Sequence, residues 1–291
     1  MERLAGDSIG PQVIGGDLCL IAGTGEGAAL PIVDQPGHGF PPAQDEASPV
    51  LYTSLSREGL LDAVPKGGVA CEIGVHRGDF SAHILAASGP KRLHLVDPWA
   101  YDASDPQEKY LRPGDGDETL ERIRLRFATE IMDGRIRLHR ETSQGAAKRF
   151  SKGYFDWIYI DGDHRYEAVL ADLRTYAPLI KPGGLILGDD YTEPTFLEAK
   201  EMDFGVVQAV KQFLSETGYS LVALTDGVWA NYAITDLPNG EICERFLSIV
   251  EALSDEVTIM PDPLSVSIQF REHTAPSGKM RLVRYVCPVK R

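Results

Sequence analysis

The sequence predicts an α/β fold: a doubly wound, mostly parallel sheet with an antiparallel hairpin on its C-terminal side. Short apolar runs of strand length alternate with longer amphipathic stretches from about Gly67 onward. Two further apolar runs follow and are joined through Asp226-Gly227, which is typical of a hairpin turn. Alternating strands and helices form a parallel sheet that is covered on both faces, so we expect helices on both sides.

The expected strands are short apolar runs bounded by turn signals. In the parallel sheet they are residues 69–73, 92–96, 136–138, 157–160 and 185–187, and in the hairpin 220–224 and 228–234. The expected helices have apolar residues at helical spacing and are residues 80–87, 118–128, 144–150, 166–177, 206–216 and 241–253. Pro178 and the following Pro182-Gly183-Gly184 are expected to end the fourth of these helices.

The chain divides into three expected parts. Residues 1–50 form a Gly/Pro-rich N-terminal arm, residues 51–235 the main domain, and residues 236–291 a C-terminal helix and extension. The closely spaced Pro31, Pro36, Pro41, Pro42 and Pro49 make a persistent helix or central strand unfavourable there. Gly23, Gly25 and Gly27 lie in this arm, and we expect a flexible loop because the third glycine of a dinucleotide motif and its βαβ setting are missing.

Composition excludes several classes of protein. The chain has 291 residues, with 29 Lys+Arg against 43 Asp+Glu, so its formal charge is −14. Such an acidic chain argues against non-specific binding to nucleic acid or an anionic membrane. The four cysteines show no metal-ligand or redox spacing, and no secretion signal or membrane-length apolar run is apparent, so we expect a cytoplasmic globular protein.

The first candidate site is the glycine turn that follows strand 69–73 and runs from Glu72 through Gly74, Val75 and Gly78 to Ser81. Glycines at a strand-to-helix turn let a ligand approach the backbone, where the helix offers unpaired N–H groups. The Glu72 carboxylate can accept hydrogen bonds from a bound polar group. A tight turn without a ligand is the alternative, and the G-x-G-x-x-G of dinucleotide-binding proteins is absent.

Asp97 is the second candidate, directly after strand 92–96 and 19 residues beyond Gly78. An acidic residue at this distance from a glycine turn is placed to bind the hydroxyls of a ribose. The alternative is structural, because Asp97-Pro98 is also a common turn initiator.

Acidic residues after two further strands form the third candidate site. Asp161 follows strand 157–160, and Asp189 and Asp190 follow strand 185–187, so the three carboxylates are expected to converge at one sheet edge. Carboxylates suit Mg²⁺ or Mn²⁺, and a divalent ion would relieve their repulsion; solvated strand-end residues are the alternative. His164 is the natural general base beside such a metal, with His76 as a second choice.

Taken together, residues 67–234 resemble the class I S-adenosylmethionine-dependent methyltransferases, which have a Rossmann-like fold. The segment from Cys71 to Gly78 resembles the family's first motif, Asp97 resembles its ribose-binding acidic residue, and Lys181-Pro182-Gly183-Gly184 resembles the turn before its fifth strand. The resemblance implies S-adenosylmethionine as cofactor. The residues it implies for binding are Glu72, Gly74, Val75, Gly78, Ser81, Asp97, Ser143, Gln144 and Asp161, with Ser143-Gln144 similar to the pair that contacts adenine.

Within this class, Asp161 to His164 together with Asp189-Asp190 resemble the metal-dependent O-methyltransferases, most closely the sugar-modifying enzymes of macrolide biosynthesis. The resemblance implies that Asp161, Asp189 and Asp190 bind Mg²⁺ and that His164 is the general base; the similar catechol O-methyltransferases have lysine at that position. The implied acceptor is a small molecule with vicinal hydroxyls, such as a sugar of a secondary metabolite.

Two alternatives stay open. One is a related protein of the cephalosporin-biosynthesis type that keeps a similar metal site, and the other is a non-catalytic protein that binds S-adenosylmethionine. A pure binding module needs neither His164 nor the Asp189-Asp190 pair, which favours an enzyme. Residues 101–116 and 191–204 are expected to be loops that shape the acceptor pocket, and the arm and tail would be free to cover a partner subunit in a homo-oligomer.

Overall fold

The computed structural model describes residues 12–14, 17–22, 49–100, 115–192, 204–227, 229–260, 266–274 and 280–288. Side chains are described within 49–260. The predicted loop at Gly23, Gly25 and Gly27 lies outside the described residues, as does most of the two loops predicted to shape the acceptor pocket.

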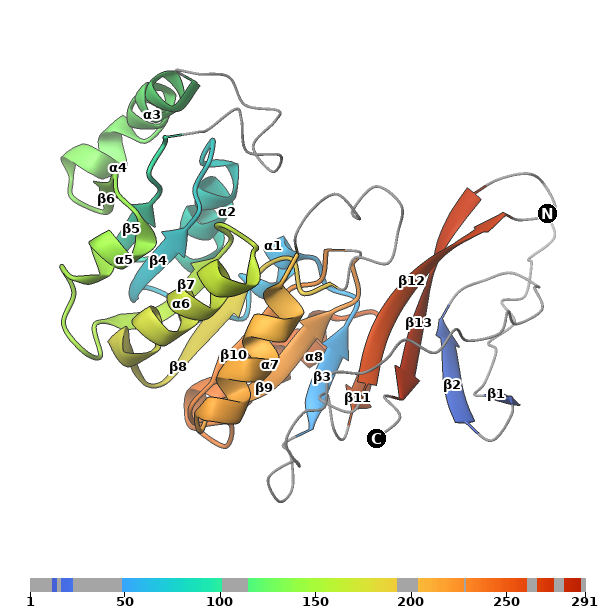
Figure 1. Ribbon diagram of the computed structural model, residues 1–291. Coiled ribbons are helices and arrows are strands. Elements are labelled where there is room, and N and C mark those ends of the chain that lie inside the picture. Colours follow the sequence, from blue (N-terminus) through green and yellow to red (C-terminus); the bar gives the residue numbers. More distant parts are fainter. Residues whose placement is uncertain are drawn as a thin grey trace, which may run out of the picture.

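A nine-stranded sheet forms the centre of the described chain (Figure 1). In spatial order its strands are β11 (Val257–Met260), β3 (Val50–Thr53), β9 (Ser220–Thr225), β10 (Tyr232–Thr235), β8 (Ile180–Gly188), β7 (Phe155–Ile160), β4 (Val69–Ile73), β5 (Arg92–Val96) and β6 (Ile136–His139). The run from β8 to β6 is parallel, whereas β10 is antiparallel to both its neighbours, β8 and β9. The predicted parallel sheet and antiparallel hairpin are therefore confirmed.

Helices cover both faces of this sheet. One face carries α5 (Ser143–Ala147), α6 (Tyr166–Tyr176) and α7 (Val206–Glu216), with the short 3₁₀ helix η1 (Ala177–Leu179) after α6. The other face carries α1 (Arg57–Leu60), α2 (Asp79–Ser88), α3 (Asp115–Arg126), α4 (Ala128–Met132) and α8 (Glu241–Leu253). In Figure 1, α6 and α7 lie in front of the strands and α8 lies behind them.

The strands read as nearly continuous apolar runs because both of their faces are buried. In β7, Ile158 and Ile160 pack in the core on the α6 side, whereas Trp157 and Tyr159 pack in the core on the opposite side. All four side chains are at most 4% exposed. A sheet between two helical layers requires this pattern, since successive side chains point to opposite faces.

Several boundaries differ from the sequence prediction; the second strand of the hairpin, for example, is expected to begin at residue 228 but begins at Tyr232. The turn expected at Lys181-Pro182-Gly183-Gly184 lies inside β8, where Phe155 pairs with Ile180 but Trp157 pairs with Leu185. The residues of β8 between Ile180 and Leu185 outnumber those of β7 between Phe155 and Trp157, so β8 bulges there. Gly183, at φ 76°, permits the bulge. The helix predicted at 118–128 starts earlier and is divided at Phe127 into α3 and α4.

A second, four-stranded antiparallel sheet joins segments from the two ends of the chain. Its order is β1 (Gln12–Ile14), β2 (Asp17–Ala22), β13 (Met280–Pro288) and β12 (Val266–Thr274). β2 pairs with β13 through Leu20 to Ala22, so part of the predicted N-terminal arm is a strand that pairs with the tail. The division at residues 50 and 235 stays a prediction.

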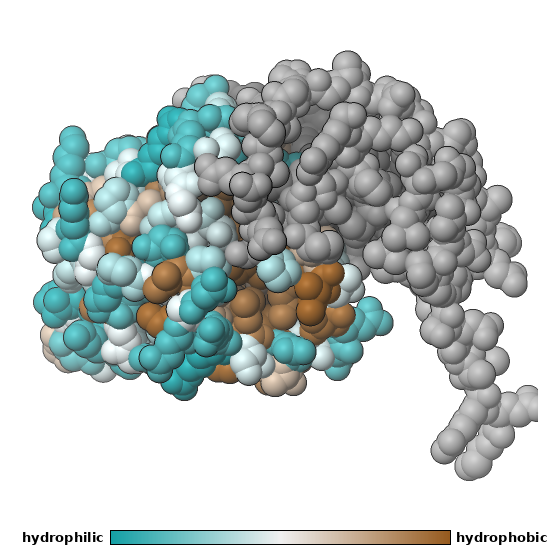
Figure 2. Space-filling view, turned by 90° about the horizontal axis from the view of Figure 1, so that it is seen from below, coloured by the Kyte–Doolittle hydropathy of each residue, from teal (hydrophilic) through white to brown (hydrophobic). Residues whose placement is uncertain are grey.

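The surface seen from below mixes hydrophilic residues with hydrophobic residues that gather toward the middle of the described part (Figure 2). Large hydrophobic side chains that are exposed among the described residues are Leu125, Met132, Trp229, Leu237, Leu253 and Ile259. Exposed apolar side chains that stand singly are normal on folded chains and identify no partner. No described helix is both long enough and apolar enough to span a bilayer.

Candidate active site

The predicted site residues lie at the carboxyl edge of the parallel strands. Glu72 lies near the end of β4, and Asp97, Asp161 and Asp189 directly follow β5, β7 and β8. From β4 the strand order runs outward in one direction to β5 and β6, and from β7 in the other direction to β8. Open α/β sheets bind ligands at the carboxyl ends of their strands where this order reverses.

Unusual backbone geometry marks the same edge. His76, Trp99 and Asp190 are the non-glycine residues with positive φ in the described chain, at 49°, 42° and 58°. They follow β4, β5 and β8. Left-handed conformations are uncommon for residues with a Cβ and concentrate at functional sites, which supports this edge as the site.

The glycine turn after β4 brings two strand ends together. Gly74 has φ 84°, and a Cβ placed on it would lie 1.9 Å from the carbonyl oxygen of Asp161. Gly74 is therefore required by backbone packing as well as by any ligand. Gly78, at φ 72°, is the N-cap of α2 and has no side chain with which to cap the first N–H groups of that helix.

Asp97 organises this turn. Its Oδ2 accepts hydrogen bonds from the backbone N–H groups of Val75 at 3.0 Å and His76 at 2.9 Å. Its Oδ1 accepts one from Trp99 N–H at 2.6 Å, and the side chain is buried. Burial raises the pKa of Asp97, although these backbone bonds oppose the rise. The contacts give Asp97 a structural role beside the predicted ribose contact, because they fix the glycine turn that would receive the cofactor.

Glu72 and Ser81 form a buried pair within the same motif. The Ser81 hydroxyl donates to Glu72 Oε2, and both side chains are at most 1% exposed. Burial raises the pKa of Glu72 to about 8, while the Ser81 hydrogen bond and the charge of Arg57 oppose the rise. The turn therefore holds a carboxyl group that is mostly neutral at pH 7 until a cation approaches it.

Ser143 and Gln144 are both tied to Asp172 on α6. Asp172 Oδ1 accepts from Ser143 Oγ at 2.5 Å and from Gln144 Nε2 at 2.8 Å. Asp172 is buried, and burial raises its pKa to about 6. The predicted adenine-contacting pair lies at the start of α5, after β6. Its side chains are oriented by Asp172 of the next helix, α6.

A cavity of about 690 Å³ lies beside the strand ends of β7 and β8. Its lining includes Arg57, His164, Asp189, Asp190, Phe204 and Trp229. The imidazole of His164 stacks on Phe204 with ring centroids 4.2 Å apart and planes 11° apart, and Phe204 stacks on Trp229 at 5.2 Å. The cavity is therefore lined by aromatic rings as well as charged groups, and its volume suits a small organic molecule.

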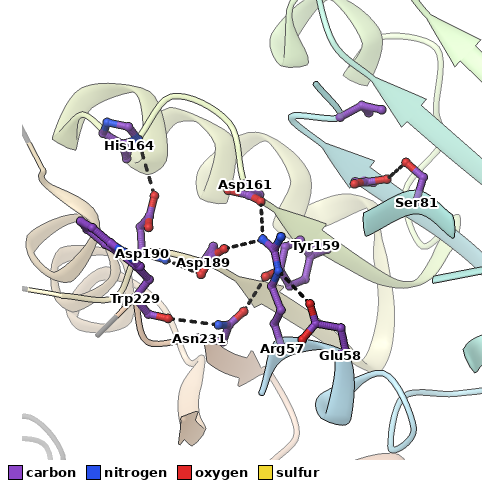
Figure 3. Close-up of polar contacts among 12 residues, drawn as sticks. Arg57, Glu58, Ser81, Tyr159, Asp161, His164, Asp189, Asp190, Trp229 and Asn231 are labelled. Atoms are coloured by element: carbon purple, nitrogen blue, oxygen red, sulfur yellow. Dashed lines mark hydrogen bonds and ion pairs between the residues drawn. The ribbon is translucent and has the colours of Figure 1, made fainter. Parts of the chain in front are cut away.

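His164 and Asp190 face each other on this wall (Figure 3). The distance from His164 Nδ1 to Asp190 Oδ2 is 3.6 Å, and both side chains are about one-fifth exposed. Burial and the neighbouring charge of Asp189 raise the pKa of Asp190 to about 7. The Asp190 carboxylate thus lies beside the histidine, and Asp190 also borders a small space together with Asp161 and Asp189.

Asp161 and Asp189 converge on a guanidinium rather than forming the expected three-carboxylate site. Arg57 Nη1 donates to Asp161 Oδ2 at 3.1 Å and to Asp189 Oδ2 at 2.8 Å (Figure 3). Among the residues that the structure describes, no group of three or more His, Cys, Asp or Glu is placed to hold a metal ion. The three aspartates lie near one another, but the arrangement differs from the expected metal site, because Arg57 pairs with Asp161 and Asp189 while His164 lies beside Asp190.

Sequence reasoning missed Arg57, Asp172 and the aromatic pair Phe204 and Trp229. Arg57 lies 104 positions before Asp161, and nothing in its local sequence links the two. Asp172 did carry a signal: it falls between Val169 and Leu173 on the apolar side of α6, where a buried carboxylate needs a partner.

Comparison with known proteins gives one family match. Residues 71–191, from β4 to the residues just after β8, match a family model described as a methyltransferase domain. The search of curated proteins gives no match to this chain.

Solved structures with similar folds are distant. A Clostridium thermocellum protein provisionally described as an rRNA methylase is 16% identical, with TM-score 0.44, over 63% of this chain and 97% of that one. A Streptococcus mutans protein provisionally described as a methyltransferase, in complex with SAH, is 11% identical, with TM-score 0.42, over 61% and 93%. Precorrin-6y C5,15-methyltransferase from Geobacter metallireducens is 12% identical, with TM-score 0.39, over 78% and 82%. Likenesses this distant carry no argument about substrate.

The sheet topology and the family match agree on one class. The central sheet, with its order reversal at β4 and β7, its antiparallel β10 and helices on both faces, has the class I methyltransferase fold. The family match supports an S-adenosylmethionine-dependent methyltransferase. The predicted subtype, a metal-dependent O-methyltransferase of sugars, stays a prediction.

Proposed function

We propose that this protein is an S-adenosylmethionine-dependent O-methyltransferase that methylates a hydroxyl group of a small molecule. The observation that carries the proposal is the position of His164. It lines the 690 Å³ cavity at the strand ends, in the domain that matches the methyltransferase family. A histidine in such a cavity can remove the proton of a hydroxyl, and O-methylation requires that step.

The residues around the glycine turn fit the cofactor. Gly74 and Gly78 permit the positive φ angles of the turn, Asp97 fixes the turn, and Glu72 supplies a buried carboxyl group near it. The residues proposed to bind are Glu72, Gly74, Val75, Gly78, Ser81, Asp97, Ser143, Gln144 and Asp161. When bound, S-adenosylmethionine supplies a methyl group from its sulfonium, and the electron pair of the broken S–C bond remains on sulfur.

His164 holds the acceptor proton in this proposal. The imidazole lines the cavity and its Nδ1 lies 3.6 Å from Asp190 Oδ2, and in this proposal the ring takes the proton from the acceptor hydroxyl. Stacking on Phe204 fixes the ring plane. Asp190 then stabilises the imidazolium that forms, because a carboxylate close to the ring favours its charged state.

Mg²⁺ or Mn²⁺ does not fit the residues as they are arranged. The two oxygens that would share the ion, on Asp161 and Asp189, both accept hydrogen bonds from Arg57. A second space bordered by Asp161, Asp189 and Asp190 has a volume of only about 10 Å³, enough for one water molecule. Mg²⁺ usually retains several waters, for which this space is too small.

The proposed acceptor is a polyhydroxylated small molecule such as a sugar of a secondary metabolite. The aromatic rings of Phe204 and Trp229 offer an apolar face, while Asn231 and Glu58 on the same cavity offer polar groups for hydroxyls. A cavity lined in this way binds a ligand that is apolar on one face and hydroxylated on the other.

Methyl transfer tests the proposal directly. We expect purified protein to bind S-adenosylmethionine but not NAD in calorimetry, and to transfer labelled methyl groups to a hydroxyl within a panel of sugars and glycosides. His164→Ala should reduce turnover by about 100- to 10,000-fold and retain cofactor binding. The control His83→Ala, at an exposed position of α2, should be unchanged. Absence of any heat with S-adenosylmethionine would contradict the proposal.

A further inference from the structure

The guanidinium of Arg57 lies where the ends of β7 and β8 approach each other. Arg57 Nη1 lies 3.1 Å from Asp161 Oδ2 and 2.8 Å from Asp189 Oδ2, so one nitrogen bridges two carboxylates from different strands. The Asp189 side chain is 10% exposed and that of Arg57 is 35% exposed. At these distances and this burial, each charge is held mainly by the other rather than by water.

Other residues near the guanidinium of Arg57 also fix its position. Ser56 accepts a hydrogen bond from Gly59 N–H at the start of α1, which fixes the backbone at Arg57. Glu58 Oε1 lies 3.4 Å from Arg57 Nε, and the guanidinium carbon lies 4.7 Å from the centre of the Phe80 ring. Phe80 belongs to α2, the helix that begins at the glycine turn. Arg57 thus contacts both the cofactor motif and the acidic strand ends.

The surrounding electrostatics keep Arg57 charged. Burial lowers its pKa, but its interactions with Tyr159, Asp189 and Asp161 outweigh burial, so the net shift is upward. Arginine does not lose its proton at physiological pH, and its planar group offers several N–H donors in fixed directions. A permanent positive charge with preset donors can neutralise two carboxylates without any bound ion.

We propose that Arg57 is the built-in cation of this site and occupies the place between Asp161 and Asp189 where a divalent metal is expected from the sequence. Arg57 also lines the cavity that holds His164. Resting on the proposed function, its role in transfer is to stabilise the negative charge that develops on the acceptor oxygen while His164 takes the proton.

Metal binding in the absence of any acceptor tests this inference. We would titrate Mn²⁺ into the full-length protein by calorimetry and by the Mn²⁺ electron paramagnetic resonance signal. Wild type should take up no Mn²⁺ at this site. Arg57→Met removes the charge at similar length and should create one site per chain, about tenfold tighter or more than any wild-type binding, because it leaves Asp161 and Asp189 without their cation.

Two further variants separate charge from structure. Arg57→Lys keeps a positive charge and should bind no more Mn²⁺ than wild type. Arg174→Ala breaks an exposed pair with Glu216 on α7 and should also leave Mn²⁺ binding at the wild-type level. Circular dichroism and thermal melting establish that each variant is folded, and Arg57→Gln replaces Arg57→Met if the latter is not.

The outcomes are distinct. Uptake of Mn²⁺ by wild type with the affinity of Arg57→Met would overturn the proposal, since a metal and Arg57 would then coexist. Failure of both Arg57→Met and Arg57→Gln to bind Mn²⁺, once folded, would overturn it as well. In the transfer assay, wild type should keep its activity in EDTA, and Arg57→Met should lose about 100-fold or more. If wild type transfers no methyl group at all, the proposed function fails. The Mn²⁺ titrations then still show whether Arg57 occupies the position of a metal ion between Asp161 and Asp189.

Discussion

Replacing Glu72 with glutamine should change how the stability of the protein depends on pH. Glu72 is fully buried, and burial raises its pKa from the ordinary 4.5 to about 8. An acid with a raised pKa in the folded state contributes stability below pH 4.5, and this contribution is lost as the pH rises toward 8. The loss is about 1.4 kcal/mol per pH unit, which amounts to about 3 kcal/mol by pH 7.

Glutamine has nearly the same shape and cannot ionise. Its amide oxygen can accept the Ser81 hydrogen bond that Glu72 accepts, so the packing of the turn is retained. We therefore expect Glu72→Gln to be more stable than wild type by about 3 kcal/mol at pH 7 and nearly equal to it at pH 4.5. If the amide N–H₂ introduced by Glu72→Gln finds no hydrogen-bond acceptor, the increase in stability at pH 7 should be smaller by the cost of that unsatisfied donor.

Urea unfolding of the cofactor-free protein at pH 5, 6, 7 and 8 measures this difference. The control Glu251→Gln removes an exposed carboxylate of α8 and should follow the wild-type pH dependence. If wild type and Glu72→Gln lose stability in parallel across this range, Glu72 is ionised in the folded protein, and the argument from its burial is refuted.

Two other predictions concern the turn and the cavity. Asp97→Asn puts an amide N–H₂ against one of the backbone donors of Val75, His76 and Trp99; we expect a stability loss of about 1–3 kcal/mol and weaker S-adenosylmethionine binding in calorimetry. Cofactor binding at wild-type strength would contradict this. Trp229→Leu should raise KM for the acceptor about tenfold with kcat nearly unchanged, because the ring forms one wall of the cavity. An unaltered KM would place the acceptor elsewhere.

The fold was largely predictable because its signals are local. The parallel strands are short apolar runs since both of their faces are buried, and β4, β5 and β7 lie where periodicity and turn residues placed them. The bulge in β8 was not predictable. Pro182 and two glycines are typical of a turn, and only the pairing of Trp157 with Leu185 shows that the strand continues through them.

The candidate site was predictable in part for the same reason. Carboxylates at the ends of parallel strands must share one edge, so Asp97, Asp161 and Asp189 could be assigned to it from strand positions alone. The partners of these residues could not be assigned, because each comes from a remote segment. Asp161 and Asp189 share Arg57 of α1, and Ser143 is oriented by Asp172 of α6.

The sequence by itself determined the α/β class, the strand order along the chain and the acidic character of the strand ends, since these depend on periodicity and residue type. Only the tertiary structure decided what balances that acidic charge. Repulsion between Asp161 and Asp189 must be relieved by a cation, and a sequence does not specify whether that cation is a bound ion or a side chain. The packing of α1 against the sheet edge brings Arg57 within 3.1 Å of both, which is a property of the fold alone.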